Sequence, residues 1–248
     1  MMEAVQALSA LAFLLVMTIL GLRLLMLAWQ NGQAAELLLG LSFLLGGSLG
    51  ATVEAVAMAG AEQIPNAGLL LGMGKFFGMV GMLASCLFTW WVFRRDDARG
   101  VVAIAFIMLV IVTAFAGHAA SGAFETGEIA RQWFLLELAG RVATPGWLGL
   151  EAYWYWRAMQ RRAALGLAEP VVVNRFGLWV VASVSGVVCL SSSVPPLFLE
   201  AGHPLLDADM LLFAAAGIAT VVAYWLAFFP PARYRAWVES RAVAATSA

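Results

Sequence analysis

The sequence has very few of the side chains from which most enzyme sites and disulfide frameworks are built. Among 248 residues it has two histidines, two cysteines and one lysine, and only 12% of its residues are charged. Cys86 and Cys189 form neither a disulfide framework nor a metal-binding spacing, so we expect each to pack as a small apolar residue. Because no cysteine–histidine cluster and no nucleophile beside a base is present, we predict no enzyme activity, no metal site and no cofactor.

Apolar residues fill most of the chain instead. They make up 63% of it, and the mean hydropathy is +0.89, which excludes an ordinary soluble domain. A membrane-spanning helix needs about 20 apolar residues, because every backbone hydrogen bond must close inside the segment. Seven stretches meet this length, at about 5–28, 36–60, 67–93, 101–121, 130–157, 175–194 and 207–229. The sequence therefore predicts an all-α, polytopic seven-transmembrane helix bundle over 1–230, followed by a basic tail over 231–248.

Arginines are distributed unevenly between the two sides of this predicted bundle. One side, which includes the tail, holds eleven of them: Arg23, Arg94, Arg95, Arg99, Arg157, Arg161, Arg162, Arg175, Arg233, Arg235 and Arg241. The other side holds only Arg131. Since basic residues are retained in the cytoplasm, we predict that the N-terminus lies outside and the C-terminus inside.

The tail combines aromatic and basic residues. Tyr234 and Trp237 stand among three of the arginines, a pattern typical of a short helix lying on an anionic leaflet, with a frayed basic tail as the alternative. The lipid bilayer is thus one predicted partner, and no feature of the chain predicts binding of nucleic acid.

Small residues recur on two neighbouring predicted helices. Gly46, Gly47 and Gly50 lie on the second, and the third carries five glycines at Gly68, Gly72, Gly74, Gly78 and Gly81. Such ridges let helix backbones approach closely. We expect these two helices to pack tightly against each other within one chain.

Charged residues inside predicted spans are the best pointers to function, because burial in a bilayer is costly unless they are paired. At a rise of about 1.5 Å per residue, Glu54, Lys75, Glu137 and Arg141 all fall about 9 to 16 Å below the outer surface. His118 lies near the outer end of the fourth span. We predict that these five residues form one polar pocket in the outer half of the bundle.

Simpler interpretations of the same residues stay open. Lys75 and Glu54 can be an ion pair that sets helix register, and Glu137 and Arg141 can neutralise each other within one helix. Pro145 follows one turn later and predicts a kink, either a hinge or a static bend.

Glu151 lies deeper in the predicted bundle, toward the cytoplasmic side. It is separated from the five outer residues and is a candidate for an inner ion path.

Short motifs at helix ends resemble known modules. Glu36-Leu-Leu-Leu-Gly, Phe93-Arg94-Arg95 and Phe228-Phe-Pro-Pro resemble those of bacterial seven-transmembrane sensory modules, which stand alone or precede histidine kinases. The resemblance implies a sensory role in the bacterial inner membrane, although this chain has no kinase domain. The last span, 207–229, contains no lysine, which excludes the retinal attachment expected of a rhodopsin.

Two functions fit these observations. The first is a receptor-like sensor whose outward-facing pocket binds a small ligand and which signals through a separate cytoplasmic or membrane protein. The alternative is a small-solute or proton-coupled transporter or channel that uses the same charges, with Glu151 continuing the path inward. The two differ in whether anything crosses the membrane.

Overall fold

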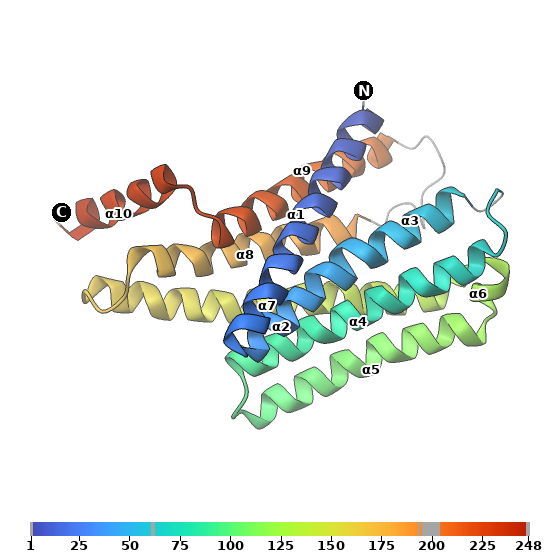
Figure 1. Cartoon of the computed structure of the whole chain (residues 1–248), viewed down its shortest axis with the longest axis horizontal. Coiled ribbons are helices and arrows are strands. Elements are labelled where there is room, and N and C mark those ends of the chain that lie inside the picture. The colour runs from blue at the N-terminus through green and yellow to red at the C-terminus, as the bar shows by residue number, and fades with distance from the viewer. Residues whose placement is uncertain (1, 61–62, 193, 195–203, 247–248) are drawn as a thin grey trace. The chain divides into compact units, whose positions relative to one another are not determined.

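The computed structural model describes residues 2–60, 63–192, 194 and 204–246, and side chains over 7–60, 63–192, 194 and 208–241. The described part of the chain is all-helical and contains no strand (Figure 1). This agrees with the all-α class predicted from hydropathy. Residue 193, near the end of the sixth predicted span, and residues 247–248 of the tail lie outside the described residues.

Six helical segments are long and apolar enough to cross a membrane. Their mean hydropathy over 18 residues ranges from 1.6 to 2.6. Five are single helices: α1 (Met2–Asn31), α4 (Ala67–Phe93), α5 (Ala98–Ala120), α8 (Pro170–Ser191) and α9 (Pro204–Phe228). The length and composition of these helices are consistent with a multi-pass membrane protein.

The second span is built from three consecutive segments without a break. These are α2 (Ala34–Leu41), the π-helix η1 (Ser42–Gly50) and α3 (Ala51–Ala59). The residues at both junctions keep right-handed helical dihedrals, so the segment stays continuous. A π-helix of nine residues is unusual, because most occur as single-turn bulges, often at functional sites.

Helix α7 (Arg131–Ala164) is the exception among the long helices. It has 34 residues, but it is not apolar enough to count among the six candidate spans. The cause is its seven charged residues, which are Arg131, Glu137, Arg141, Glu151, Arg157, Arg161 and Arg162. The structure thus confirms the predicted helix and extends it, while the seventh crossing stays a prediction.

The chain divides into two compact units. One is Ala10–Thr144, here called the N-terminal unit. The other is Pro145–Ala248 together with Met1–Ser9, here called the C-terminal unit. The division falls inside α7, between Thr144 and Pro145. The prediction of one undivided membrane domain over 1–230 is left untested by this division.

Close glycine contacts hold the N-terminal unit together. Gly46 of η1 meets Gly81 of α4, and a Cβ built on Gly50 would lie 2.8 Å from the backbone nitrogen of Gly78. The predicted tight packing of the second and third spans is therefore confirmed at these positions. Gly72 instead packs on the side chain of Phe124, in the short helix α6 (Ala123–Thr126).

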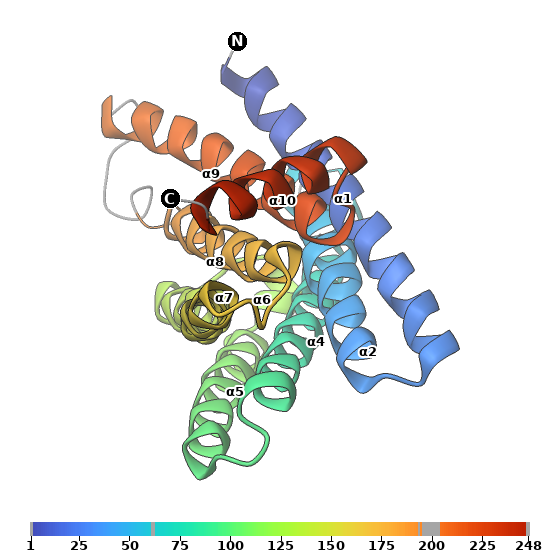
Figure 2. The same ribbon diagram turned by 90° about the vertical axis from the view of Figure 1, so that its left-hand side faces the viewer.

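The C-terminal unit contains the second part of α7 and the helices α8, α9 and α10 (Ala232–Thr246). Helices α8 and α9 lie side by side, and α10 packs on α8 (Figure 2). Ser9 Oγ joins the start of α1 to this unit by donating to the Ala214 carbonyl at 3.2 Å. The basic tail is thus helical over Ala232–Thr246, while its predicted place on an anionic leaflet stays a prediction.

Candidate functional site

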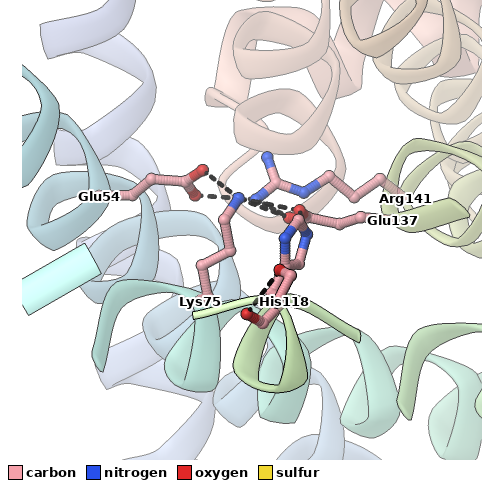
Figure 3. A network of polar contacts seen from close by, with 6 residues as sticks. Glu54, Lys75, His118, Glu137 and Arg141 are labelled. Carbon is pink, nitrogen blue, oxygen red and sulfur yellow. Dashed lines mark hydrogen bonds and ion pairs between the residues drawn. The ribbon is translucent and has the colours of Figure 1, made fainter. Parts of the chain in front are cut away.

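Four charged side chains of the N-terminal unit form a closed ring of alternating sign (Figure 3). Lys75 Nζ lies 2.7 Å from Glu54 Oε1 and 2.8 Å from Glu137 Oε2. Arg141 Nη2 lies 2.8 Å from Glu54 Oε2 and 2.5 Å from Glu137 Oε1. Each carboxylate therefore bridges both cations, and the charges of the four side chains sum to zero. We call this set the charge ring.

The ring is buried unevenly. The side chains of Lys75 and Glu137 are 3% and 9% exposed, and that of Glu54 is 14% exposed. Arg141 is the open member, with 29% of its side chain exposed. The ring is thus closed on the side of Lys75 and Glu137 and less covered along the side chain of Arg141.

His118 adds an ionisable group to the ring. Its Nε2 lies 2.9 Å from Glu137 Oε2, and its side chain is 1% exposed. The other ring nitrogen, Nδ1, is buried and has no hydrogen-bond partner among the described residues. When Nε2 carries the hydrogen and donates it to Glu137, Nδ1 is a hydrogen-bond acceptor without a donor among the described residues.

Glycines bring the backbones of the contributing helices close to the ring. A glycine directly precedes each of the two cations and the histidine: Gly74 precedes Lys75, Gly140 precedes Arg141 and Gly117 precedes His118. A Cβ on Gly74 would lie 2.7 Å from the Glu54 backbone nitrogen. A Cβ on Gly117 would overlap the indole of Trp133, and one on Gly140 would lie 2.8 Å from the Ile111 side chain. The helix crossings and the ionic contacts therefore occur at the same level of the unit.

The structure brings together all five residues that the sequence singled out for the polar pocket. They come from α3, α4, α5 and the first part of α7. Arg141 does not pair only with Glu137 within α7, since the same nitrogen also bonds Glu54 across 87 positions of sequence. The self-contained intrahelical pair considered above is thus wrong. The function of the five residues in ligand binding stays a prediction.

Pro145 and Glu151 lie in the C-terminal unit. Helix α7 continues through Pro145, although this residue has no N–H to donate to the Arg141 carbonyl one turn earlier. Glu151 is 7% exposed and accepts a hydrogen bond from Trp147 Nε1 at 3.2 Å. The predicted hinge at Pro145 and the predicted inner ion path through Glu151 stay predictions.

Several features near the charge ring were not foreseen. Ser121 Oγ donates to the His118 carbonyl at 3.0 Å, just beyond the end of α5. Buried Cys86 Sγ lies 3.5 Å from Thr144 Oγ1, and that hydroxyl donates to the Gly140 carbonyl at 2.9 Å. The π-helix η1 ends four residues before Glu54. None of these three features was read from the sequence, whereas the glycine that precedes each cation is visible in it.

Comparisons with other proteins add no family to these observations. No family model, no curated protein and no solved structure matches the chain. Within the described residues no group of three or more histidine, cysteine or acidic side chains is placed to hold a metal ion. The resemblance of short motifs to bacterial sensory modules stays a prediction.

Proposed function

We propose that this protein is a membrane receptor that senses a small anionic molecule at the charge ring. The observation that carries the proposal is the position of α7. This helix supplies Glu137 and Arg141 to the ring in one compact unit and continues, past Pro145, into the other. A change at the ring therefore has a covalent, helical route out of the unit that contains it.

The proposal includes α7 as a seventh span, with the N-terminus outside and the C-terminus in the cytoplasm. At about 1.5 Å per residue its 34 residues extend about 50 Å, more than the roughly 30 Å of a bilayer core. Its low hydropathy comes partly from Glu137 and Arg141, whose charges are neutralised inside the ring. The uneven arginine distribution supports the orientation, and the motif resemblance supports the bacterial inner membrane.

An anionic ligand suits the ring because Arg141 is both its most exposed member and a guanidinium. A carboxylate or phosphate can accept two parallel hydrogen bonds from a guanidinium. Such a ligand would replace the Glu54 carboxylate at Arg141, so the guanidinium stays paired while its bond to α3 is exchanged.

Transmission would follow from that exchange. Freed from Glu54, α7 is released from α3 and can reorient about Pro145, where one helical hydrogen bond is missing. The far end of α7 carries Arg157, Arg161 and Arg162, which are suited to contact a separate cytoplasmic or membrane signalling protein. A ligand can shift such an equilibrium only by its differential affinity for the two states.

The test is a thermal-shift screen of the full chain in detergent at constant ionic strength. The probes are sodium acetate, succinate, citrate and phosphate, with acetamide and succinamide as neutral controls. We expect one or more of the anions to raise the unfolding midpoint of the wild type, and Arg141→Gln to abolish that rise. The matched control is Arg99→Gln, which removes an exposed arginine outside the ring and should keep the response.

Two results would redirect the proposal. Equal shifts in wild type and Arg141→Gln, or no shift with any anion, would remove the charge ring as the sensing site. Uptake of the stabilising anion into liposomes containing the protein would favour the transporter. Pro145→Ala separates binding from signalling, because it should keep the thermal shift and lose ligand-induced changes in hydrogen exchange beyond residue 145.

A further inference from the structure

The C-terminal unit has a small hollow at the point where three of its helices meet. Residues from the first turns of α8 and α10, the last turn of α9 and the linker between α9 and α10 line it. Its polar lining consists of Asn174, Arg175, Tyr234 and Arg235, and its apolar lining includes Val171, Leu178, Leu226 and Val238. None of these residues belongs to the charge ring, so the hollow is independent of the function proposed above.

A pair of hydrogen bonds holds the walls of the hollow together. Asn174 Nδ2 donates to the Tyr234 hydroxyl at 2.9 Å, and that hydroxyl lies 3.3 Å from Asn174 Oδ1. Val238 is 9% exposed and anchors the next turn of α10. The hydrogen-bonded contact between α8 and α10 therefore holds the walls of the hollow in place.

The two arginines of the hollow have no anionic partner. Both Arg175 and Arg235 are exposed, and neither guanidinium makes an ion pair or hydrogen bond to any side chain that the structure describes. Glu169 and Glu239, the nearest acidic residues in sequence, do not line the hollow. The first turns of α8 and α10 also present the positive ends of their helix dipoles here. The site is cationic and lacks an anion of its own.

The hollow lies at the level where a membrane span ends. The candidate span α9 ends at Phe228, two residues before Pro230 in the lining, and the candidate span α8 begins at Pro170 (Figure 1). Trp237 is 48% exposed beside the hollow, stacks on Tyr234 at 5.7 Å and carries Arg241 over its ring at 4.5 Å. Exposed indoles with neighbouring arginines are typical of the headgroup region of a bilayer.

We infer that Arg175 and Arg235, which are exposed where they line the hollow, bind the phosphate headgroup of an anionic phospholipid that lies over it. The guanidiniums match the charge and geometry of a phosphodiester. The apolar lining matches the glycerol and first methylenes of the same molecule, which a free phosphate lacks. Because α10 supplies Arg235 and α8 supplies Arg175, a bound headgroup would join the tail helix to the membrane domain.

The experiment uses the full chain in a neutral detergent, titrated with phosphatidylglycerol, phosphatidylcholine or inorganic phosphate. Binding is counted by native mass spectrometry and followed by the unfolding midpoint. We expect phosphatidylglycerol to bind and to raise the midpoint, and phosphatidylcholine and phosphate to have little effect at equal concentration. Each arginine that contacts the phosphate should contribute roughly a fivefold change in affinity, so Arg175→Gln with Arg235→Gln should weaken binding roughly 30-fold.

Two control variants distinguish loss of the lipid site from a general loss of structure. Arg233→Gln removes an exposed arginine of α10 that does not line the hollow, and it should retain wild-type lipid binding. Arg175→Lys with Arg235→Lys retains both charges and should keep more affinity than the glutamine pair. The inference is overturned when Arg233→Gln weakens binding as much as the double glutamine variant, when phosphatidylcholine binds equally, or when phosphate alone reproduces the shift.

Discussion

Lys75 in the N-terminal unit and the two arginines of the hollow in the C-terminal unit differ in how their charges are paired. In the N-terminal unit Lys75 is 3% exposed and bonds two carboxylates, so its charge is satisfied entirely from within the chain. In the C-terminal unit Arg175 and Arg235 are exposed at a hollow whose lining contains no acid. A charge buried inside a bilayer needs an oppositely charged partner from the same chain. A charge at the level of the lipid headgroups can instead be paired by another molecule, such as an anionic lipid.

The largest effect should come from removing the central cation of the charge ring. Lys75→Met leaves two buried carboxylates with one remaining guanidinium, so we expect it to lower the free energy of unfolding by about 3–5 kcal/mol. Unfolding in mixed micelles with increasing dodecyl sulfate measures this quantity. Arg99→Met, at an exposed site, should change it little.

A double variant sharpens this prediction. Combining Lys75→Met with Glu54→Gln restores a neutral ring, so the two losses should be clearly less than additive. Additive losses would mean that the two charges act independently, and the comparison between the units would lose its physical basis.

The next effect tests the helix crossing that supports the ring. Gly74→Ala places a methyl group 2.7 Å from the Glu54 backbone nitrogen, so we expect a loss of about 1–3 kcal/mol in the free energy of unfolding. Gly78→Ala, one turn later on the same helix, has no atom within 4 Å of the added carbon and should be neutral or slightly stabilising. Similar losses for both alanines would contradict the close approach of α3 and α4 at the ring.

A smaller effect is expected for the polar contact in the other unit. Tyr234→Phe removes the hydroxyl that joins α10 to Asn174, which should cost about 0.5–1.5 kcal/mol in the same unfolding assay. Tyr153→Phe is the control, since no hydrogen bond to that hydroxyl is found among the described residues. A loss as large as that of Lys75→Met would erase the energetic difference between the two units.

The smallest effect concerns Asp97, the N-cap residue of α5, which lies just outside the candidate membrane spans. Asp97 accepts a backbone hydrogen bond from Arg99 at the start of α5, and this bond, followed by that from Arg94, lowers the pKa of its carboxyl below 3.8. A lowered folded-state pKa means that the stabilisation is fully present above the unfolded pKa and is lost as pH falls through the folded value. The difference in unfolding midpoint between wild type and Asp97→Asn should therefore be constant near neutral pH, decrease as pH falls below 3.8 and disappear below the lowered folded-state pKa. A difference that persists in acid would assign the cap to side-chain geometry instead of charge.

Much of the fold followed from local composition. The predicted ranges 67–93 and 101–121 differ from α4 and α5 by at most three residues at either end. The break between the first two predicted ranges falls at Asn31-Gly32, where Gly32 has a φ of 65°. The π-helix η1 was not predicted, because its apolar sequence is as compatible with α-helical as with π-helical hydrogen bonding.

The charge ring was predictable in its members and in two of its contacts, Lys75–Glu54 and Glu137–Arg141, but not in the two contacts that close it. Depth along each helix indicated that Glu54, Lys75 and Glu137 lie at similar levels. The rotation of each helix decides which side chains meet, and that angle depends on packing at Gly74, Gly117 and Gly140. The hollow beside α10 was not predicted at all, since nothing in the order of residues shows that α10 packs on α8.

The amino-acid sequence alone determined that the helices are long and apolar enough to cross a membrane, where they lie in the chain and where each charge lies along its helix. These properties depend on runs of about 20 apolar residues and a fixed rise per residue, both of which are local. Tertiary structure alone decided that Lys75 reaches Glu137, 62 positions away, and that Arg141 bonds two carboxylates instead of one. The physical reason is that an ion pair forms within a few ångströms, and such distances between separate helices are set by how their surfaces pack.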